Sequence, residues 1–341
     1  MRDFKGFRHG INLGGWLSQC VHTEDHYRAF ISASDFSVIR NWGADHVRIP
    51  VDYEVLEEED GTPKESGLRL LRQAIGWARG NSLRVILDLH KTAGFSFDPD
   101  EHETGFFDNE AFQERFYALW ERLSSAFGQE EDVAFELLNE VTEKSYCAAW
   151  NRIAAECIRR IRRIAPDSKI LVGGYYHNSA AAVKDISLPD TRNIIFNFHC
   201  YEPLIFTHQG ADWIPTMDPE FRISVRASYA ELEKARWEML NEPTAGFEGF
   251  DPSDSLSSAF FEDFFSEAVR AAEAADVPLY CGEHGVIDRA APEDALAWYR
   301  LIYPVFEKYG IGRAAWSYKE MDFGLADARM DAVREELLKV L

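Results

Sequence analysis

Short apolar runs recur along the chain, and most are separated by stretches whose apolar residues repeat at helical spacing. Continuous apolar runs of this length are typical of parallel strands that are buried on both faces. The pattern predicts eight strands, at His9–Leu13, His46–Pro50, Arg84–His90, Ala134–Asn139, Lys169–Gly173, Ile194–His199, Leu279–Gly282 and Ala314–Ser317. Amphipathic helices are predicted at Leu68–Arg79, Glu110–Phe127, Cys147–Ile164, Phe260–Ala274 and Pro292–Lys308.

Eight strands that alternate with helices predict an α/β fold of the (β/α)8 TIM barrel type. A doubly wound open sheet is the alternative, and it would place a glycine-rich phosphate loop after an early strand. Gly14 and Gly15 follow the first strand, but the chain has no G-x-G-x-x-G and no P-loop. The barrel is therefore favoured, as one catalytic domain over residues 1–341.

The connection after the sixth predicted strand, residues 203–257, is much longer than its counterparts. It contains an amphipathic segment around Val225–Leu240. Long connections inside a compact domain are usually functional insertions. We expect a small helical subdomain between strand 6 and helix 6, beside or over the cleft. A surface elaboration that serves only stability is the alternative.

The formal net charge of −22 disfavours nucleic acid and anionic membranes as partners, because both are bound mainly through Lys and Arg. It does not disfavour a neutral polymer. We expect a monomer without a membrane span, either cytoplasmic or a mature secreted form, since no N-terminal apolar segment precedes Gly10 and no window approaches ~20 apolar residues. The five cysteines have no zinc-like spacing, and the ten histidines form no H-x-H or H-E-x-x-H motif. Because carboxylates can account for the chemistry considered below, no metal and no cofactor is predicted.

Polar or aromatic residues close six of the predicted strands. In a parallel barrel these strand ends meet at the C-terminal face, where catalytic residues collect. One such residue is more often structural, but six strands that end this way favour an active site. The strand-closing groups are Arg48-Ile49-Pro50, Asp88-Leu89-His90, Asn139-Glu140, His199-Cys200-Tyr201, Gly282-Glu283-His284 and Trp316-Ser317-Tyr318.

Glu140 and Glu283 are the strongest candidates for chemistry. Two carboxyl groups across one cleft can divide the roles of proton donor and nucleophile in cleavage of a glycosidic bond. Burial or crowding by charge can hold one glutamate protonated, while the other stays ionised and attacks the anomeric carbon. Arg48 and Tyr201 would favour the ionised form of a nearby carboxylate. Asn139 could bind a sugar 2-hydroxyl, and Trp316 offers a flat face to a sugar ring.

The sequence resembles glycoside hydrolase family 5, and within it the clostridial endoglucanase group whose chains begin GINLGGW. The resemblance runs from Gly10 to about Phe323. It rests on Arg48 in HVRIP, His90 in LDLH, Asn139-Glu140 in ELLNEV, His199 and Tyr201 in NFHCYEP, Glu283 in LYCGEHGV, Trp316 in AAWSYKEMDF, FTHQ at Phe206–Gln209, and Trp213.

The resemblance implies a retaining endo-β-1,4-glucanase that acts on a β-glucan. It implies Glu140 as acid/base and Glu283 as nucleophile, with Arg48 and Tyr201 orienting Glu283. It also implies that Asn139 binds the 2-hydroxyl. His90, His199 and Trp316 would line the subsite before the cleaved bond.

The substrate is left open by the sequence. Mixed-linkage β-1,3-1,4-glucanase, β-mannanase and exo-β-1,3-glucanase are alternatives within the class, and a non-catalytic carbohydrate-binding barrel is an alternative outside it. Val141, Lys91 and His284 depart from the common family pattern, and the last two could alter neighbouring subsites. Trp213 and Tyr175 are predicted substrate contacts, whereas the loop phenylalanines are predicted to be structural.

Overall fold

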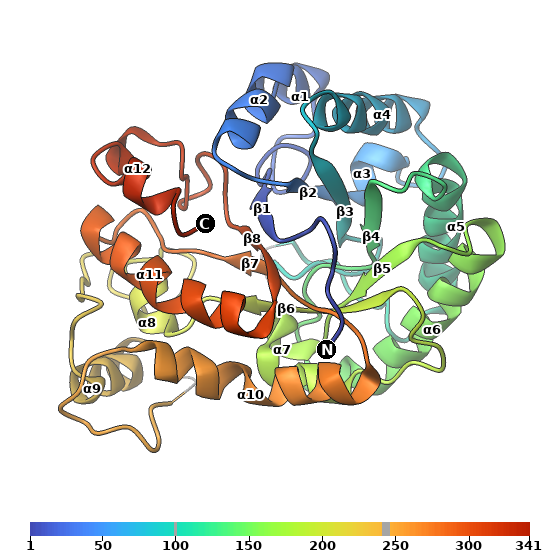
Figure 1. Ribbon diagram of the computed structural model, residues 1–341. Coiled ribbons are helices and arrows are strands. Elements are labelled where there is room, and N and C mark those ends of the chain that lie inside the picture. The colour runs from blue at the N-terminus through green and yellow to red at the C-terminus, as the bar shows by residue number, and fades with distance from the viewer. Residues whose placement is uncertain (99–100, 241–245) are drawn as a thin grey trace.

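The computed structural model describes residues 1–98, 101–240 and 246–341. Its strands form a closed parallel barrel in the order β1 to β8, and the main helices surround the strands (Figure 1). The predicted barrel is therefore confirmed. The strands are β1 (His9–Asn12), β2 (His46–Asp52), β3 (Arg84–Lys91), β4 (Val133–Glu136), β5 (Lys169–Val172), β6 (Ile194–Cys200), β7 (Leu279–His284) and β8 (Gly312–Ala315).

Strand β4 ends at Glu136, earlier than the apolar run predicts. Beyond it the chain is still held between its neighbours, because Leu137 N–H donates to Leu171 O (3.2 Å) and Asn139 N–H to Leu89 O (3.1 Å). These single hydrogen bonds extend the backbone without a regular ladder. They place Glu140 at the C-terminal face, just above the strand ends.

The helices are α1 (Glu24–Phe30), α2 (Ala33–Asn41), α3 (Tyr53–Leu56), α4 (Glu65–Gly80), α5 (Glu110–Phe127), α6 (Cys147–Ile164), α7 (Tyr175–Asn178), α8 (Leu204–Thr207), α9 (Tyr229–Met239), α10 (Ser258–Ala275), α11 (Pro292–Tyr309) and α12 (Arg334–Leu337). Helix α6 buries Trp150, Ile153, Cys157 and Ile161, which recur every three or four residues. Helix α11 begins at a proline and ends before Gly310, which is left-handed at φ 68°.

The connection between β5 and β6 lacks a long helix. It consists of α7, whose backbone is left-handed at Tyr176 and His177, and of the 3₁₀ helix η2 (Ala180–Asp185). Helix α10 packs against η2 instead. The loop above β5 can therefore lie close to the residues that follow β4.

The 203–257 connection contains α8 and α9, and its residues 241–245 lie outside the described residues. Tyr229 at the start of α9 packs against Phe247 and Phe250, and both of these rings contact Phe260 of α10. An aromatic cluster thus fixes the connection to the outer layer of the barrel. Its description as a subdomain that serves the cleft stays a prediction.

The N-terminal end of the barrel is closed by rings. Phe4 and Phe7 stack at a centroid distance of 4.2 Å, and Phe4 meets Tyr280 edge to face. With Ile86, Ala134, Leu171, Ile195 and Ala314 they form a separate buried cluster inside the barrel. Above this apolar layer the inward positions of the strands become polar.

Among the described residues, no helix is both long enough and apolar enough to cross a membrane.

Candidate active site

Arg48 of β2 is the centre of the polar layer and has no exposed surface. Its Nε and Nη2 donate to the two oxygens of Glu136 at 2.7 and 2.8 Å, and Nη1 donates to Oε1 of Glu283 at 2.8 Å. Asp88 Oδ2 lies 3.0 Å from Nη2. Burial lowers the pKa of Arg48, but Asp88, Glu136 and Glu283 outweigh it and raise that pKa well above its ordinary value. One guanidinium therefore binds three carboxylates.

Three amides complete this layer. Asn12 accepts from Arg48 Nη1 at 3.0 Å, and Asn139 accepts from Nη2 at 2.7 Å. Asn197 Nδ2 donates to Glu136 at 2.8 Å, and its oxygen accepts from the backbone of Gly282. Asn12 and Asn139 thus hold Arg48 directly, and Asn197 holds its partner Glu136, so the orientation of Arg48 is fixed from several sides.

Glu283 lies at the end of β7 and is 5% exposed. Arg48 binds Oε1, and the hydroxyl of Tyr201 donates to Oε2 at 2.8 Å. Burial raises the pKa of Tyr201, and the charges of Glu283 and Glu140 raise it further, so this hydroxyl keeps its proton. The contacts predicted for Arg48 and Tyr201 are therefore present. Each therefore holds one oxygen of the Glu283 carboxylate.

Glu140 is held by two imidazoles. Its Oε1 accepts from Nδ1 of His199 at 2.6 Å, and its Oε2 accepts from Nδ1 of His177 at 2.9 Å. Burial raises the pKa of Glu140, but the hydrogen bonds from His177 and His199 outweigh it and hold that pKa well below its ordinary value. These hydrogen bonds favour the carboxylate form of Glu140 in the ligand-free structure, and its role as acid/base stays a prediction.

The two glutamates lie side by side. One carboxylate oxygen of Glu140, one of Glu283 and a ring nitrogen of His199 are all within 4.8 Å of one another. His199 Nδ1 is 2.6 Å from Glu140 and 3.6 Å from Glu283, so its ring lies between the two. Burial lowers the pKa of His199, but the two carboxylates raise it above its ordinary value.

Trp316 and His90 stack against one another beside the two glutamates. Their rings are parallel within 1° at a centroid distance of 5.8 Å. His90 Nδ1 donates to Asp88 at 2.6 Å, and Phe97 meets the ring of His90 edge-on at 4.9 Å. Gly14 is required beside Trp316, because a Cβ at that position would lie 2.8 Å from the indole ring. The GINLGGW motif thus makes room for this tryptophan.

The two predicted aromatic contacts differ in outcome. Trp213 is 44% exposed and packs on Phe323 and His208, which both contact the ring of Tyr201. It therefore stays a predicted contact at the rim. Tyr175 is 4% exposed and its hydroxyl binds Asp185, so the prediction that it contacts substrate is wrong.

The departures at Lys91 and His284 also have structural explanations. Lys91 is buried and forms ion pairs with Glu101 at 2.7 Å and Glu54 at 2.9 Å. His284 is on the outer side of β7, where its Nδ1 donates to Ala314 O at 3.0 Å and its ring packs against Trp298. His284 thus belongs to the contact between barrel and helix layer, and the suggestion that it alters a subsite is wrong.

Burial and the charge of Arg313 lower the pKa of His284 to about 3. Below its ordinary pKa of about 6.5 the unfolded chain binds a proton that the folded chain does not, so stability falls as the pH drops toward 3. We expect His284→Phe to reduce the loss of unfolding free energy between pH 7 and pH 4 by up to about 3 kcal/mol. Urea unfolding at several pH values measures this, with His102→Gln as an exposed control. An unchanged pH dependence in His284→Phe would contradict the prediction.

Two groups of side chains in the described residues offer three possible metal ligands each. One is Glu140, His199 and Glu283, and the other is His22, Asp52 and Glu54. An internal cation already contacts each group, since Arg48 binds Glu283 and the ammonium of Lys91 binds Glu54.

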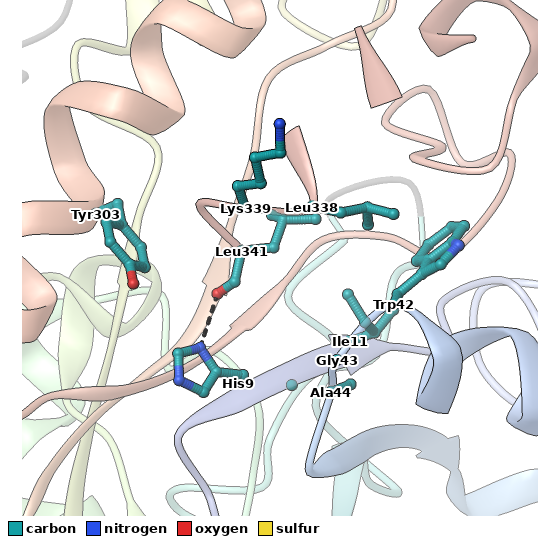
Figure 2. Close-up of a pocket in the computed structure, with 10 residues that line it drawn as sticks. His9, Ile11, Trp42, Gly43, Ala44, Tyr303, Leu338, Lys339 and Leu341 are labelled. Carbon is teal, nitrogen blue, oxygen red and sulfur yellow. Dashed lines mark hydrogen bonds between the residues drawn. The ribbon is translucent and has the colours of Figure 1, made fainter. Parts of the chain in front are cut away.

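The structure also contains a pocket of about 180 Å³, which Figure 2 shows in close-up. It is lined by His9 and Ile11 of β1, by Trp42 after α2, and by Tyr303 and Leu341. His9 is at the N-terminal end of its strand, so the pocket is near the opposite face from the two glutamates. None of its lining residues is a sequence-predicted site residue.

Several site residues escaped the sequence analysis. Glu136, Asn12 and Asn197 lie inside apolar runs, and a polar residue in the middle of a buried strand was an available signal for them. His177 follows a short strand in the segment YYHN, where no periodicity or motif indicates its contact with Glu140. Only the fold brings it there.

The chain has clear relatives among known proteins. A family model described as cellulase, glycosyl hydrolase family 5, matches residues 9–322. Cellodextrinase A of Ruminococcus flavefaciens is 43% identical over 314 residues, which are 92% of this chain and 86% of that protein. Endoglucanase C of Acetivibrio thermocellus is 34% identical over 340 residues and 98% of both chains. The crystal structure of endoglucanase Cel5A from Thermotoga maritima has a TM-score of 0.77 at 24% identity and covers 98% of this chain and 97% of its own.

Proposed function

This chain belongs to the cellulase family, glycosyl hydrolase family 5, and we propose that it hydrolyses internal β-1,4 bonds of β-glucans with retention of configuration. The observation that carries the proposal is the position of the two glutamates, whose nearest oxygens are within 4.8 Å. Carboxyl groups about 5–5.5 Å apart are typical of retaining glycosidases, whereas inverting ones leave about 6.5–9.5 Å for a water molecule. The short separation supports a covalent intermediate.

In the first step a carboxylate oxygen of Glu283 attacks the anomeric carbon while Glu140 donates its proton to the leaving sugar oxygen. Arg48 and Tyr201 orient the Glu283 carboxylate through hydrogen bonds and leave lone pairs of its oxygens for the attack. In the second step Glu140 removes a proton from water, and this water displaces Glu283 from the sugar. Glu140 must therefore be protonated at the start of the first step and ionised at the start of the second.

The names of the relatives support β-1,4-linked glucose as the substrate class, since one is called an endoglucanase and one a cellodextrinase. The cellodextrinase has the higher identity, so short soluble cello-oligosaccharides are the second candidate substrate. We also propose that the ring of Trp213 supports a sugar at the rim, which its exposure and its packing next to Phe323 support. Mixed-linkage glucan, mannan and β-1,3-glucan remain the alternatives from the sequence.

Proton NMR of cellopentaose hydrolysis tests the stereochemistry, and products from barley β-glucan, carboxymethylcellulose, mannan and laminarin test the substrate. We expect the β-anomer of the new reducing end to appear first and to mutarotate afterwards. On barley β-glucan, viscosity should fall faster than reducing ends accumulate. An initial α-anomer would contradict retention, and release of one product size from the start would contradict endo action.

A further inference from the structure

Three consecutive residues without a glycine adopt the left-handed conformation above β5. Tyr176, His177 and Asn178 have φ values of 51°, 53° and 55°. Side chains with a Cβ rarely adopt this conformation, and it persists only where the surrounding structure enforces it. Strained backbone of this kind clusters at functional sites, so the turn calls for a specific purpose.

The turn is attached to the chain that carries Glu140. Tyr176 N–H donates to Thr142 O at 3.1 Å and His177 N–H donates to Val141 O at 3.0 Å. On the other side Asn178 is completely buried, and its Nδ2 lies 3.4 Å from Nε2 of His199. The strained turn thus reaches both oxygens of the Glu140 carboxylate. It reaches Oε2 through His177, and Oε1 through Asn178 and His199.

From these contacts we propose that His177 is a positioning residue for the general acid/base, and that its imidazole holds Oε2 of Glu140 until the leaving sugar oxygen replaces it. The proposal rests on the function proposed above. The side chain of His177 is 54% exposed and that of His199 is 2% exposed. Oε1 is thus held from the barrel interior, whereas Oε2 is held from the solvent side, where a departing sugar can reach it.

The arrangement explains how one carboxyl group can serve both steps. While His177 donates to Oε2, Glu140 is stabilised as the carboxylate that removes a proton from water in the second step. When the sugar oxygen occupies that position, one of the two donors is lost and burial favours the protonated form. The proton that Glu140 then donates forms the O–H bond of the leaving sugar, and Glu140 recovers a proton from water in the second step.

Other ionisable groups also face Glu140. His199 contacts it from β6, and Glu283 lies within 4.8 Å on β7. Tyr201 after β6 and His208 after α8 feel its charge as well. Glu283 disfavours the ionised form of Glu140, whereas His199 and His177 favour it. Removing His177 shifts this balance toward protonation while the other groups stay in place.

The test compares His177→Ala and His177→Gly with the parent enzyme and with Tyr176→Ala, which changes the same turn at an exposed ring. The substrates are p-nitrophenyl and 2,4-dinitrophenyl β-cellobioside, and kcat/KM is measured from pH 4 to 9. We expect both His177 variants to move the basic limb of the p-nitrophenyl profile upward by about half a pH unit or more. The dinitrophenyl profile should not move, since that leaving group departs without a proton. Tyr176→Ala should leave both profiles unchanged.

The two His177 variants separate side chain from backbone, because glycine relieves the left-handed strain and alanine does not. An equal shift of the basic limb in both variants supports the proposal. A shift in His177→Ala alone would show that the strained turn causes the effect, and would overturn the proposal. Parental profiles in both variants would also overturn it. Glu140→Ala tests the proposed function separately from the role of His177. If that variant kept parental activity toward cellopentaose, the assigned role of Glu140 would be wrong and this inference would fail with it.

Discussion

Replacing Glu283 by alanine is expected to lower kcat for barley β-glucan and cello-oligosaccharides by roughly 10⁴- to 10⁶-fold. The variant removes the atom that attacks the anomeric carbon, and no other carboxylate in the described structure is held in the same position. Stability should change little, because Arg48 keeps its contacts with Glu136 and Asp88 after Glu283 is lost. Initial rates and urea unfolding measure the two effects separately.

Azide provides a control that assigns the roles of both glutamates. In Glu283→Ala an azide ion can occupy the vacated space and displace an activated aryl leaving group once, which inverts the configuration and gives an α-glycosyl azide. In Glu140→Ala the azide attacks the glycosyl-enzyme instead, so two inversions give the β-glycosyl azide. Hydrolysis at the parental rate by Glu283→Ala, or the reverse pattern of azide products, would show that the assignment is wrong.

Replacing Arg48 by alanine is expected to lower the free energy of unfolding by about 3–5 kcal/mol, in addition to removing activity. Glu136 and Asp88 are completely or almost completely buried, and Arg48 is the cation that both contact. Without it their charges lie close together in a medium where desolvation is expensive. Burial and the charge of Asp88 already raise the pKa of Glu136, although Arg48 opposes this.

A matched double variant identifies the origin of that loss. Arg48→Met combined with Glu136→Gln removes one buried charge of each sign and should recover part of the stability lost in Arg48→Met alone. Denaturant titration of the parent, both single variants and the double variant gives the coupling energy. Independent, additive losses would show that the pair does not stabilise the fold through its charges.

The sequence was informative wherever a pattern repeats with the period of a strand or a helix. Helices α5 and α6 begin and end at the predicted residues, because the stretch of apolar residues at helical spacing ends where the helix ends. The side chains of Arg48, Tyr201 and Glu283 also meet as predicted, since parallel strands bring their carboxyl ends to one face. In a parallel barrel, a residue at the carboxyl end of any strand can therefore be assigned to the same face from the sequence alone.

Features that depend on loops and on local electrostatics could not be predicted in this way. The lowered pKa of Glu140 depends partly on His177, whose left-handed turn has no sequence signature without a glycine. His284 directly follows Glu283 in β7, and successive side chains of a strand point to opposite faces, so its place in the motif did not show that it lies against the helix layer. A residue that follows a catalytic one along the chain can thus be on the other side of the barrel wall.

The stacked rings of Phe4 and Phe7 give the N-terminal segment a role in the electric field of the site. With the rest of their cluster they fill this end of the barrel with apolar side chains of low dielectric constant, so water does not screen the guanidinium from that side. Low-dielectric walls of this kind focus field lines toward the open face of the barrel. Through this asymmetry, two phenylalanines at the opposite end of the barrel increase the potential that Arg48 exerts on Glu283.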